Sequence, residues 1–399
     1  MLSIRQKLLV GASITLAAAS VQAKDYGPGV SDTEIRIGNI MPYSGPASAW
    51  STIGKATAAY FEMVNDRGGI NGRKIRFISS DDAYSPPKTV EQARRLVEHE
   101  EVLLILEPLG TAPNSAIRQY MNNRKVPQLF VSSGASKWND PGNYPWTMGW
   151  QPNYRDEAAI YARHMLQRNP DARIGILYQN DDYGKDYLNG FKESLGEKAA
   201  AMVVAEASYE VTDPTVDSQI VSLKGSGADT FFNVGSPKFA AQAIRKAAEI
   251  GWKPAHYLNI PANSVGATLE PAGLANAVGI YSAFYLKDPT DPQWRDDPAY
   301  KEWDAWMDKY FSGGDKVNTF NVIGYLVAQT MEQVLKQAGD VLTRENVMKQ
   351  AANLDIELPM LLPGIRIQTS PTDYAPIEAV RIGQFNGTRF ELQGEVVGK

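Results

Sequence analysis

GNIMPYSGPASAWSTIGKATAAYFEMV, residues 38–64, joins a short apolar strand to an amphipathic helix through a turn of small residues. The turn ends at Trp50, a large indole in a place where small polar residues predominate. Strand–turn–helix units that recur along a chain are typical of parallel sheets with crossover helices. The stretch therefore predicts an α/β fold, with Trp50 near the carboxyl end of a strand.

The same pattern continues in two series, which predicts two lobes. In the first series we expect strands at 35–41, 74–79, 102–106 and 127–131, and helices that begin near residues 51, 85 and 114. In the second series we expect strands at 173–178, 202–206, 230–234, 256–260 and 278–284, and helices from near residues 183, 215 and 237. Helices at 299–310, 319–338 and 344–353 then precede a β-rich tail at 364–397.

The composition points to an exported globular protein. The chain has 399 residues, 43% of them hydrophobic, with a formal net charge of −5 and no cysteine. Residues 1–23 have a basic start, an apolar run and small residues before Ala23, the pattern of a cleaved signal peptide. We therefore expect a periplasmic protein without disulfides, and the acidic balance argues against nucleic acid as its partner.

Sequence signatures of catalysis and of cofactor binding are missing. His99, His164 and His256 lie far apart without a metal-ligand spacing. The chain contains no nucleophile elbow, no dinucleotide fingerprint and no phosphate loop. We expect no metal, no cofactor and no enzyme, although a catalytic site assembled by the fold from distant Ser, Asp and His residues stays open.

Small residues and isolated aromatics follow most of the expected strands. Ligands of open α/β sheets lie beyond the carboxyl ends of the strands, where exposed backbone N–H groups and helix N-termini attract anions. The stretches concerned are 43–50, 81–84, 109–112, 132–135, 180–183, 235–237 and 261–263. Each could be an ordinary turn or cap, but together they favour a cleft for a small organic anion.

Four short stretches of the sequence resemble a known family. Tyr43-Ser44-Gly45-Pro46, the turn at 65–72, Asp81-Asp82 and Asp182-Tyr183-Gly184 are similar to stretches in periplasmic solute-binding proteins of ABC importers, in the branched-chain amino-acid group. The resemblance implies a type I periplasmic-binding fold, in which two Rossmann-like lobes joined by crossing segments close on a small molecule. It places the lobes at 24–152 plus 286–361 and at 153–285 plus 362–399. It also implies a monomer that delivers its ligand to a membrane permease.

The resemblance also implies where the ligand binds. From the first lobe the contacts would come from Trp50, Thr111, Ser132, Ser133, Gly134 and Ala135. Tyr183 and Ser236 would close over the ligand from the second lobe, Phe320 would line the cleft, and Tyr84 lies nearby. Arg155 is a further candidate to meet a ligand carboxylate, with a solvated first-turn residue as the alternative.

One departure from the family concerns the ligand itself. Amino-acid binders of this group carry an acidic residue where this chain has Ala262, within Ile260-Pro261-Ala262-Asn263-Ser264. Because a buried ammonium needs a counter-charge, we expect an aromatic or hydrophobic carboxylic acid without an α-amino group. A branched-chain or other hydrophobic amino acid stays open if Asp82, Asp181 or Glu107 supplies the charge. A ligand sensor for a membrane receptor and a periplasmic hydrolase are the remaining alternatives.

Overall fold

The computed structural model describes residues 25–398. The expected signal peptide at 1–23 lies outside these residues. Among the helices between residues 25 and 398, none combines the length and the apolar character needed to cross a membrane.

A five-stranded parallel sheet forms the core of the first lobe, in the order β3-β2-β4-β5-β6. Its strands are β2 (Glu34–Met41), β3 (Lys74–Asp81), β4 (Leu104–Leu106), β5 (Gln128–Val131) and β6 (Thr147–Gly149). Its helices are α1 (Ser51–Asp66), α2 (Pro86–Glu98) and α3 (Thr111–Asn123). β4 and β5 are buried along their whole length, as expected for parallel strands that are covered by helices on both faces.

The second lobe contains a larger mixed sheet, in the order β16-β15-β11-β10-β9-β7-β8. The parallel strands are β7 (Ile174–Gln179), β8 (Val203–Tyr209), β9 (Thr230–Val234), β10 (Ala255–Leu258) and β11 (Tyr281–Phe284). The antiparallel edge consists of β15 (Ala379–Phe385), β16 (Phe390–Leu392) and β17 (Val397–Gly398). The main helices are α4 (Tyr154–Arg168), α5 (Asp182–Leu195), α7 (Asp217–Gly225) and α8 (Pro237–Glu249), with short α6 (Ala199–Met202) and α9 (Glu270–Ala272). The two-lobed α/β fold with parallel-sheet cores is therefore confirmed.

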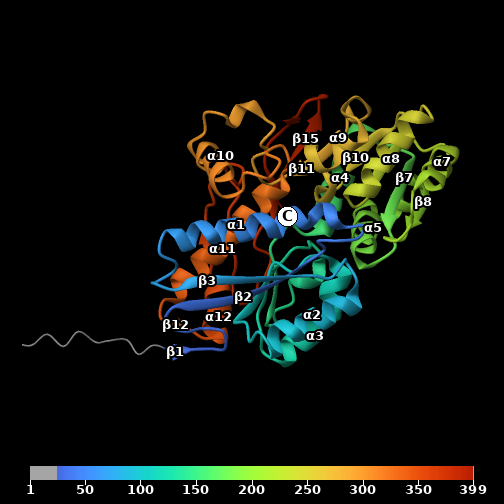
Figure 1. The fold of residues 1–399 in the computed structure, drawn as a ribbon. Helices are drawn as coiled ribbons and strands as arrows, with labels where there is room; N and C mark the ends of the chain where they lie inside the picture. Colours follow the sequence, from blue (N-terminus) through green and yellow to red (C-terminus); the bar gives the residue numbers. More distant parts are fainter. Residues whose placement is uncertain (1–24, 399) are drawn as a thin grey trace, which may run out of the picture.

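Three late helices return to the first lobe. They are α10 (Pro298–Tyr310), α11 (Phe320–Ala338) and α12 (Arg344–Ala351). Figure 1 shows α11, in orange, running beside α1, in blue, and α10 also packs on α1. The approach of α11 to α1 requires Gly324, because a Cβ there would lie 2.3 Å from the carbonyl oxygen of Ile53.

Two small sheets complete the described chain. β1 (Asp25–Tyr26) pairs in parallel with β12 (Val341–Leu342), and β13 (Asp355–Ile356) pairs antiparallel with β14 (Ile367–Gln368). The chain passes between the two large sheets after β6, after β11 and again before β15. The residue boundaries of the two lobes stay a prediction.

Element boundaries differ from expectation at a few places. The strands β4 and β11 begin two and three residues later than predicted, and α3 begins at Thr111 instead of near Asn114. Pro113 occupies the third position of α3, which is allowed because the first N–H groups of a helix have no partner within the helix. The earlier start brings the N-terminus of α3 directly to the carboxyl end of β4.

Candidate functional site

A cavity of about 440 Å³ lies where the carboxyl ends of the strands of both lobes meet. Residues that follow β2, β3, β4 and β5 line one side, and residues that follow β7 and β10 line the other, together with the start of α11. The lining residues are Trp50, Ile53, Tyr84, Leu109, Gly110, Thr111, Ser132, Gln151, Tyr154, Tyr183, Ile260, Pro261, Phe320 and Ile323.

Six of the expected binding residues line this cavity. They come from separate loops of both lobes and from the late helix α11: Trp50, Tyr84, Thr111, Ser132, Tyr183 and Phe320. Five of them come from the loops expected at strand ends, and Phe320 was implied by the resemblance; the contact of all six with a ligand stays a prediction.

The other expected residues lie elsewhere. Ser133, Gly134 and Ala135 line a second, smaller cavity next to the first. Ser236 is fully buried, and its backbone N–H donates to the hydroxyl of Tyr209 at 2.9 Å. Ala262 is fully buried in a short helical turn, Ile260–Ala262, whose other two residues form the cavity wall.

Arg155 also has another role than the one expected. Its Nε lies 2.8 Å from Oδ1 of Asp186, and its Nη1 lies 2.8 Å from Oε2 of Glu193. The guanidinium of Arg155 therefore already forms ion pairs with two carboxylates, and Arg155 does not line the cavity. Sequence could not reveal this pairing, because both partners lie on α5, more than thirty residues further along the chain.

Several lining residues were missed. Ile53 and Ile323 stand three positions after Trp50 and Phe320 on α1 and α11, so helical spacing could have found them. Leu109, Gly110, Ile260 and Pro261 belong to strand-end loops of which other members were chosen. Gln151 and Tyr154 come from the first crossing segment and its helix start, where no periodic pattern points to a site.

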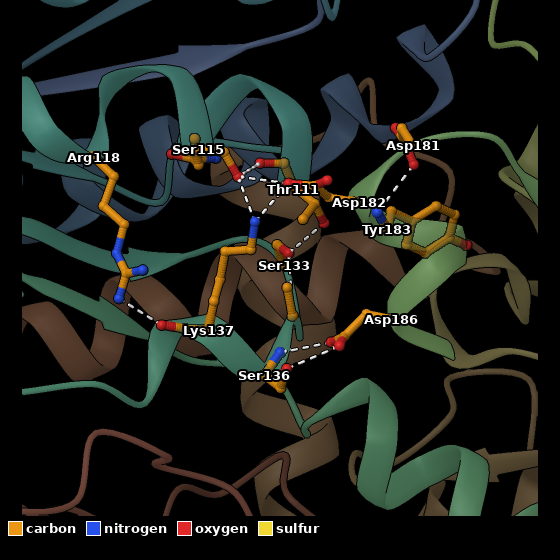
Figure 2. Close-up of polar contacts among 12 residues, drawn as sticks. Thr111, Ser115, Arg118, Ser133, Ser136, Lys137, Asp181, Asp182, Tyr183 and Asp186 are labelled. Atoms are coloured by element: carbon orange, nitrogen blue, oxygen red, sulfur yellow. Dashed lines mark hydrogen bonds and ion pairs between the residues drawn. The ribbon is translucent and has the colours of Figure 1, made fainter. Parts of the chain in front are cut away.

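Hydrogen-bond donors gather on one side of the cavity. Figure 2 shows a dashed contact between the hydroxyls of Thr111 and Ser133, which lie 2.7 Å apart. Nε2 of Gln151 donates to the hydroxyl of Ser132 at 3.4 Å. Within residues 25–398, the backbone N–H groups of Thr111 and Ala112 donate to no other group, and no side chain caps α3. Unpaired N–H groups at a helix N-terminus favour a negatively charged ligand group at this place.

Aromatic rings form much of the remaining wall. The ring centroids of Trp50 and Tyr84 lie 6.1 Å apart, and those of Tyr154 and Tyr183 lie 5.4 Å apart. Nε1 of Trp50 donates to the carbonyl oxygen of Pro261 at 2.9 Å, a hydrogen bond from the first lobe to the second. Trp50 is therefore a wall of the cavity and also a direct link between the lobes.

The three carboxylates that could have met an ammonium lie behind the cavity wall. Asp82 accepts hydrogen bonds from the backbone N–H of Tyr84 and the hydroxyl of Thr89, at 2.9 and 2.7 Å. Asp181 caps α5 through the backbone N–H of Tyr183 at 3.0 Å. Glu107 accepts from the hydroxyl of Thr57 at 2.6 Å.

Burial shifts the pKa values of these acids upward. It raises the pKa of Asp82 and of Asp181, and it raises the pKa of Glu107 to about 8. Glu157, whose Oε1 accepts from the backbone N–H of Ile260 at 2.8 Å, has its pKa raised by burial to about 7. The residues that line the cavity include no Asp, Glu, Lys, Arg or His.

The fold and the interlobe cavity are those of a protein that binds a small molecule between two lobes, and sequence comparison gives the family. Residues 34–389 match the Periplasmic binding protein family, so the chain belongs to it. Leu/Ile/Val-binding protein homolog 7 of Brucella abortus (strain 2308) is 26% identical over 277 residues, which are 66% of each chain. Homolog 8 of Brucella suis biovar 1 (strain 1330) is 24% identical over 369 residues, 88% of this chain and 86% of the relative.

Solved structures confirm the fold. A branched-chain amino acid ABC transporter protein from Thermus thermophilus with bound valine superposes with a TM-score of 0.84 at 15% identity, over 93% of this chain and 98% of the other. A fatty acid ABC transporter substrate-binding protein from Thermomonospora curvata superposes with a TM-score of 0.79 at 22% identity, over 94% and 95% of the two chains. The predicted resemblance to the Leu/Ile/Val-binding group is thus confirmed.

Proposed function

We propose that this protein is the substrate-binding component of an ABC importer and captures a small carboxylic acid with an aromatic or hydrophobic body and no α-amino group. The observation that carries this proposal is the lining of the cavity, which offers hydrogen-bond donors and aromatic rings but no Asp, Glu, Lys, Arg or His side chain.

The electrostatics of the two ligand ends differ. A carboxylate next to Thr111 would meet the free N–H groups and the dipole of α3, which compensate for its loss of water. An ammonium buried in the same cavity would have no carboxylate partner in the lining, at an effective cost of several kcal/mol. The cavity therefore favours an acid over the amino acid of the same shape.

A hydrophobic amino acid is the second candidate, because the relatives are named for Leu, Ile and Val and one solved structure of this fold contains valine. The substrate-binding protein from Thermomonospora curvata belongs to a fatty acid transporter, so this fold also serves acids that lack an amino group. Membership of the family supports a periplasmic location and a membrane permease as the partner. A monomer is proposed, and a sensor for a membrane receptor would differ only in the partner that it binds.

The test compares two ligands that differ only in the amino group. Purified protein is mixed with 3-phenylpropionate or with phenylalanine, and the same comparison is made for 4-methylpentanoate and leucine. Binding is measured by native mass spectrometry and by thermal unfolding, where ligand at one hundred times its Kd adds about 2.7 kcal/mol of stability. We expect the acids to bind and to be recovered unchanged. Stabilisation by the amino acids alone would refute the proposed carboxylic acid ligand. Turnover of a separate panel of esters and amides would favour the hydrolase.

A further inference from the structure

A second cavity of about 230 Å³ lies next to the first one. Its walls come from the turn after β5, from the first crossing segment and from the last crossing segment. They comprise Ser133, Gly134, Ala135, Trp138, Asn139, Gly149, Gln151, Asn153, Tyr374, Ala375 and Pro376. Among the described residues, Gln151 is the one residue that lines both cavities.

The partition between the cavities consists of polar groups, and one of them can move. Ser132 faces the first cavity and Ser133 the second, and the hydroxyl of Ser133 is held by Thr111 at 2.7 Å. Gln151 is half-buried, and within residues 25–398 its side chain makes one long hydrogen bond, 3.4 Å from Nε2 to the hydroxyl of Ser132. A weak bond of this length costs little to break, so Gln151 is the part of the partition that can rotate.

The other walls of the second cavity are fixed. Nε1 of Trp138 donates to the hydroxyl of Ser133 at 3.0 Å, and Nδ2 of Asn139 donates to Asp373 at 2.9 Å. The hydroxyl of Tyr374 donates to the carbonyl oxygen of Pro145 at 3.2 Å. The second cavity is therefore preformed. How much of it can be reached from the first cavity depends on the position of Gln151.

The lining of the second cavity is uncharged and includes several polar side chains among apolar ones. Oδ1 of Asn153 accepts from the backbone N–H of Arg155 at 2.8 Å, whereas its NH₂ group donates to no other group within residues 25–398. A free amide donor fits an acceptor such as a carbonyl or hydroxyl oxygen. A second carboxylate would find no cation in this lining.

We propose that the second cavity is a subsite for an uncharged polar substituent next to the carboxylate of the ligand, and that Gln151 is the residue that limits its size. The placement follows from the partition, because Thr111 and the N-terminus of α3, which would hold the carboxylate, adjoin it. The proposal rests on the proposed function. It narrows the ligand class to acids that carry a hydroxyl, keto or amide group a few bonds from the carboxylate.

Two probes test the subsite by isothermal titration calorimetry: 3-phenylpropionate and its 2-(carbamoylmethyl) derivative, which share the acid and the ring. The measured quantity is the ratio of their affinities. We expect Gln151→Ala to shift this ratio at least tenfold toward the substituted acid, because the partition loses its movable part. Ala375→Leu, which fills the far side of the second cavity, should reverse the shift in the double variant and lower the ratio when introduced alone.

Ile53→Ala is the matched control, since it enlarges the first cavity at its apolar wall and leaves the second cavity unchanged. It should alter both affinities together and leave their ratio constant. An unchanged ratio in Gln151→Ala, with 3-phenylpropionate still bound, would overturn the subsite and leave the proposed function standing. Failure of the wild-type protein to bind either acid would overturn both. Because Ala375→Leu keeps Gln151, it provides a second, independent shift of the ratio if Gln151→Ala folds poorly.

Discussion

The most unusual single residue of the first lobe is Glu107, at the end of β4. It is fully buried with a φ of 53°, Oε2 accepts from Thr57, and Oε1 has no partner among the described residues. Burial raises the pKa of this carboxyl group to about 8, against the opposing effect of the hydrogen bond from Thr57. The folded protein therefore keeps Glu107 protonated at neutral pH, whereas the unfolded chain ionises it near its ordinary value of 4.5.

This difference makes stability depend on pH, with a definite sign. Between pH 4.5 and 8 the native state binds a proton at Glu107 that the unfolded state has lost, so this residue lowers the stability as the pH rises. Glu107→Gln removes the ionisable group and keeps a side chain of nearly the same shape. We expect the variant to gain stability relative to the wild type from pH 5 to pH 8, by at most about 1.4 kcal/mol per pH unit. Urea unfolding at several pH values measures it.

Glu98→Gln is the control for this experiment. Glu98 is exposed, and hydrogen bonds from Tyr120 and Arg124 lower its pKa, so its titration falls below pH 5. Its substitution should give a stability difference that is constant between pH 5 and pH 8. A constant difference for Glu107→Gln as well would show that Glu107 ionises equally in both states.

Sequence predicted part of the cavity lining from the loops that follow strands, although it missed other members of the same loops. Trp50, Thr111 and Tyr183 were found in this way, since parallel strands deliver their carboxyl ends to one edge of each sheet. Gln151 was not predicted, because a crossing segment has no periodic hydrophobic pattern from which the orientation of its side chains could be inferred. Arg155 was misplaced because its partner Asp186 lies on another helix, which only the folded chain brings within 2.8 Å.

At the scale of elements, the N-terminus of α5 meets the first lobe in a polar contact that lies outside both cavities. Nζ of Lys137 lies 2.5 Å from Oδ2 of Asp182, and the hydroxyl of Ser115 lies 3.3 Å from the same atom, as drawn in Figure 2. The backbone N–H and the hydroxyl of Ser136 donate to Asp186 at 2.7 and 2.8 Å. We call these five residues the rim contact.

The rim contact joins the lobes through residues that line neither cavity, so it stabilises closure with or without a ligand. Lys137→Met should raise the Kd of the bound acid by up to about fivefold, since a partly exposed ion pair contributes about 0.2–1 kcal/mol. The wild-type Kd should also increase with salt, and that of the variant should do so less. Titration calorimetry at low and high salt measures both effects.

Lys192→Met supplies the comparison. Nζ of Lys192 lies 2.7 Å from Glu206, in an exposed pair of similar length that belongs entirely to the second lobe. Its removal should leave the Kd and the salt dependence as they are. Equal changes in the two variants would mean that the rim contact has no special part in closure.

At the scale of the whole molecule, the sequence could predict that there are two lobes but not how close together they lie. Each βα series has its own hydrophobic pattern, and this local pattern is enough to predict a lobe. The contacts between the lobes instead involve residues such as Trp50 and Pro261, which are 211 positions apart. The return of α10, α11 and α12 to the first lobe was likewise implied by the family resemblance and not by periodicity. What the folded chain adds is a closed arrangement, with direct hydrogen bonds from one lobe to the other.

Closure of this kind is a population shift, because a ligand stabilises the closed form only through contacts that the open form lacks. The hydrogen bond from Trp50 to Pro261 is one protein contact that the open form must lose. Trp50→Phe removes this donor and keeps an aromatic ring in the wall. We therefore expect a larger radius of gyration than in the wild type when no ligand is present, and the wild-type closed value at saturating 3-phenylpropionate. Small-angle X-ray scattering with and without the acid measures both.

Trp252→Phe separates this effect from the loss of any buried indole hydrogen bond. Nε1 of Trp252 donates to the carbonyl oxygen of Ala228 at 3.0 Å, and both residues lie in the second lobe. That variant should lose stability and keep the wild-type radius in both states. If Trp50→Phe behaved in the same way, Trp50 would be an ordinary buried residue. If only Trp50→Phe opens the free protein, the indole at the end of the first strand–turn–helix unit couples ligand capture to the closing of the lobes.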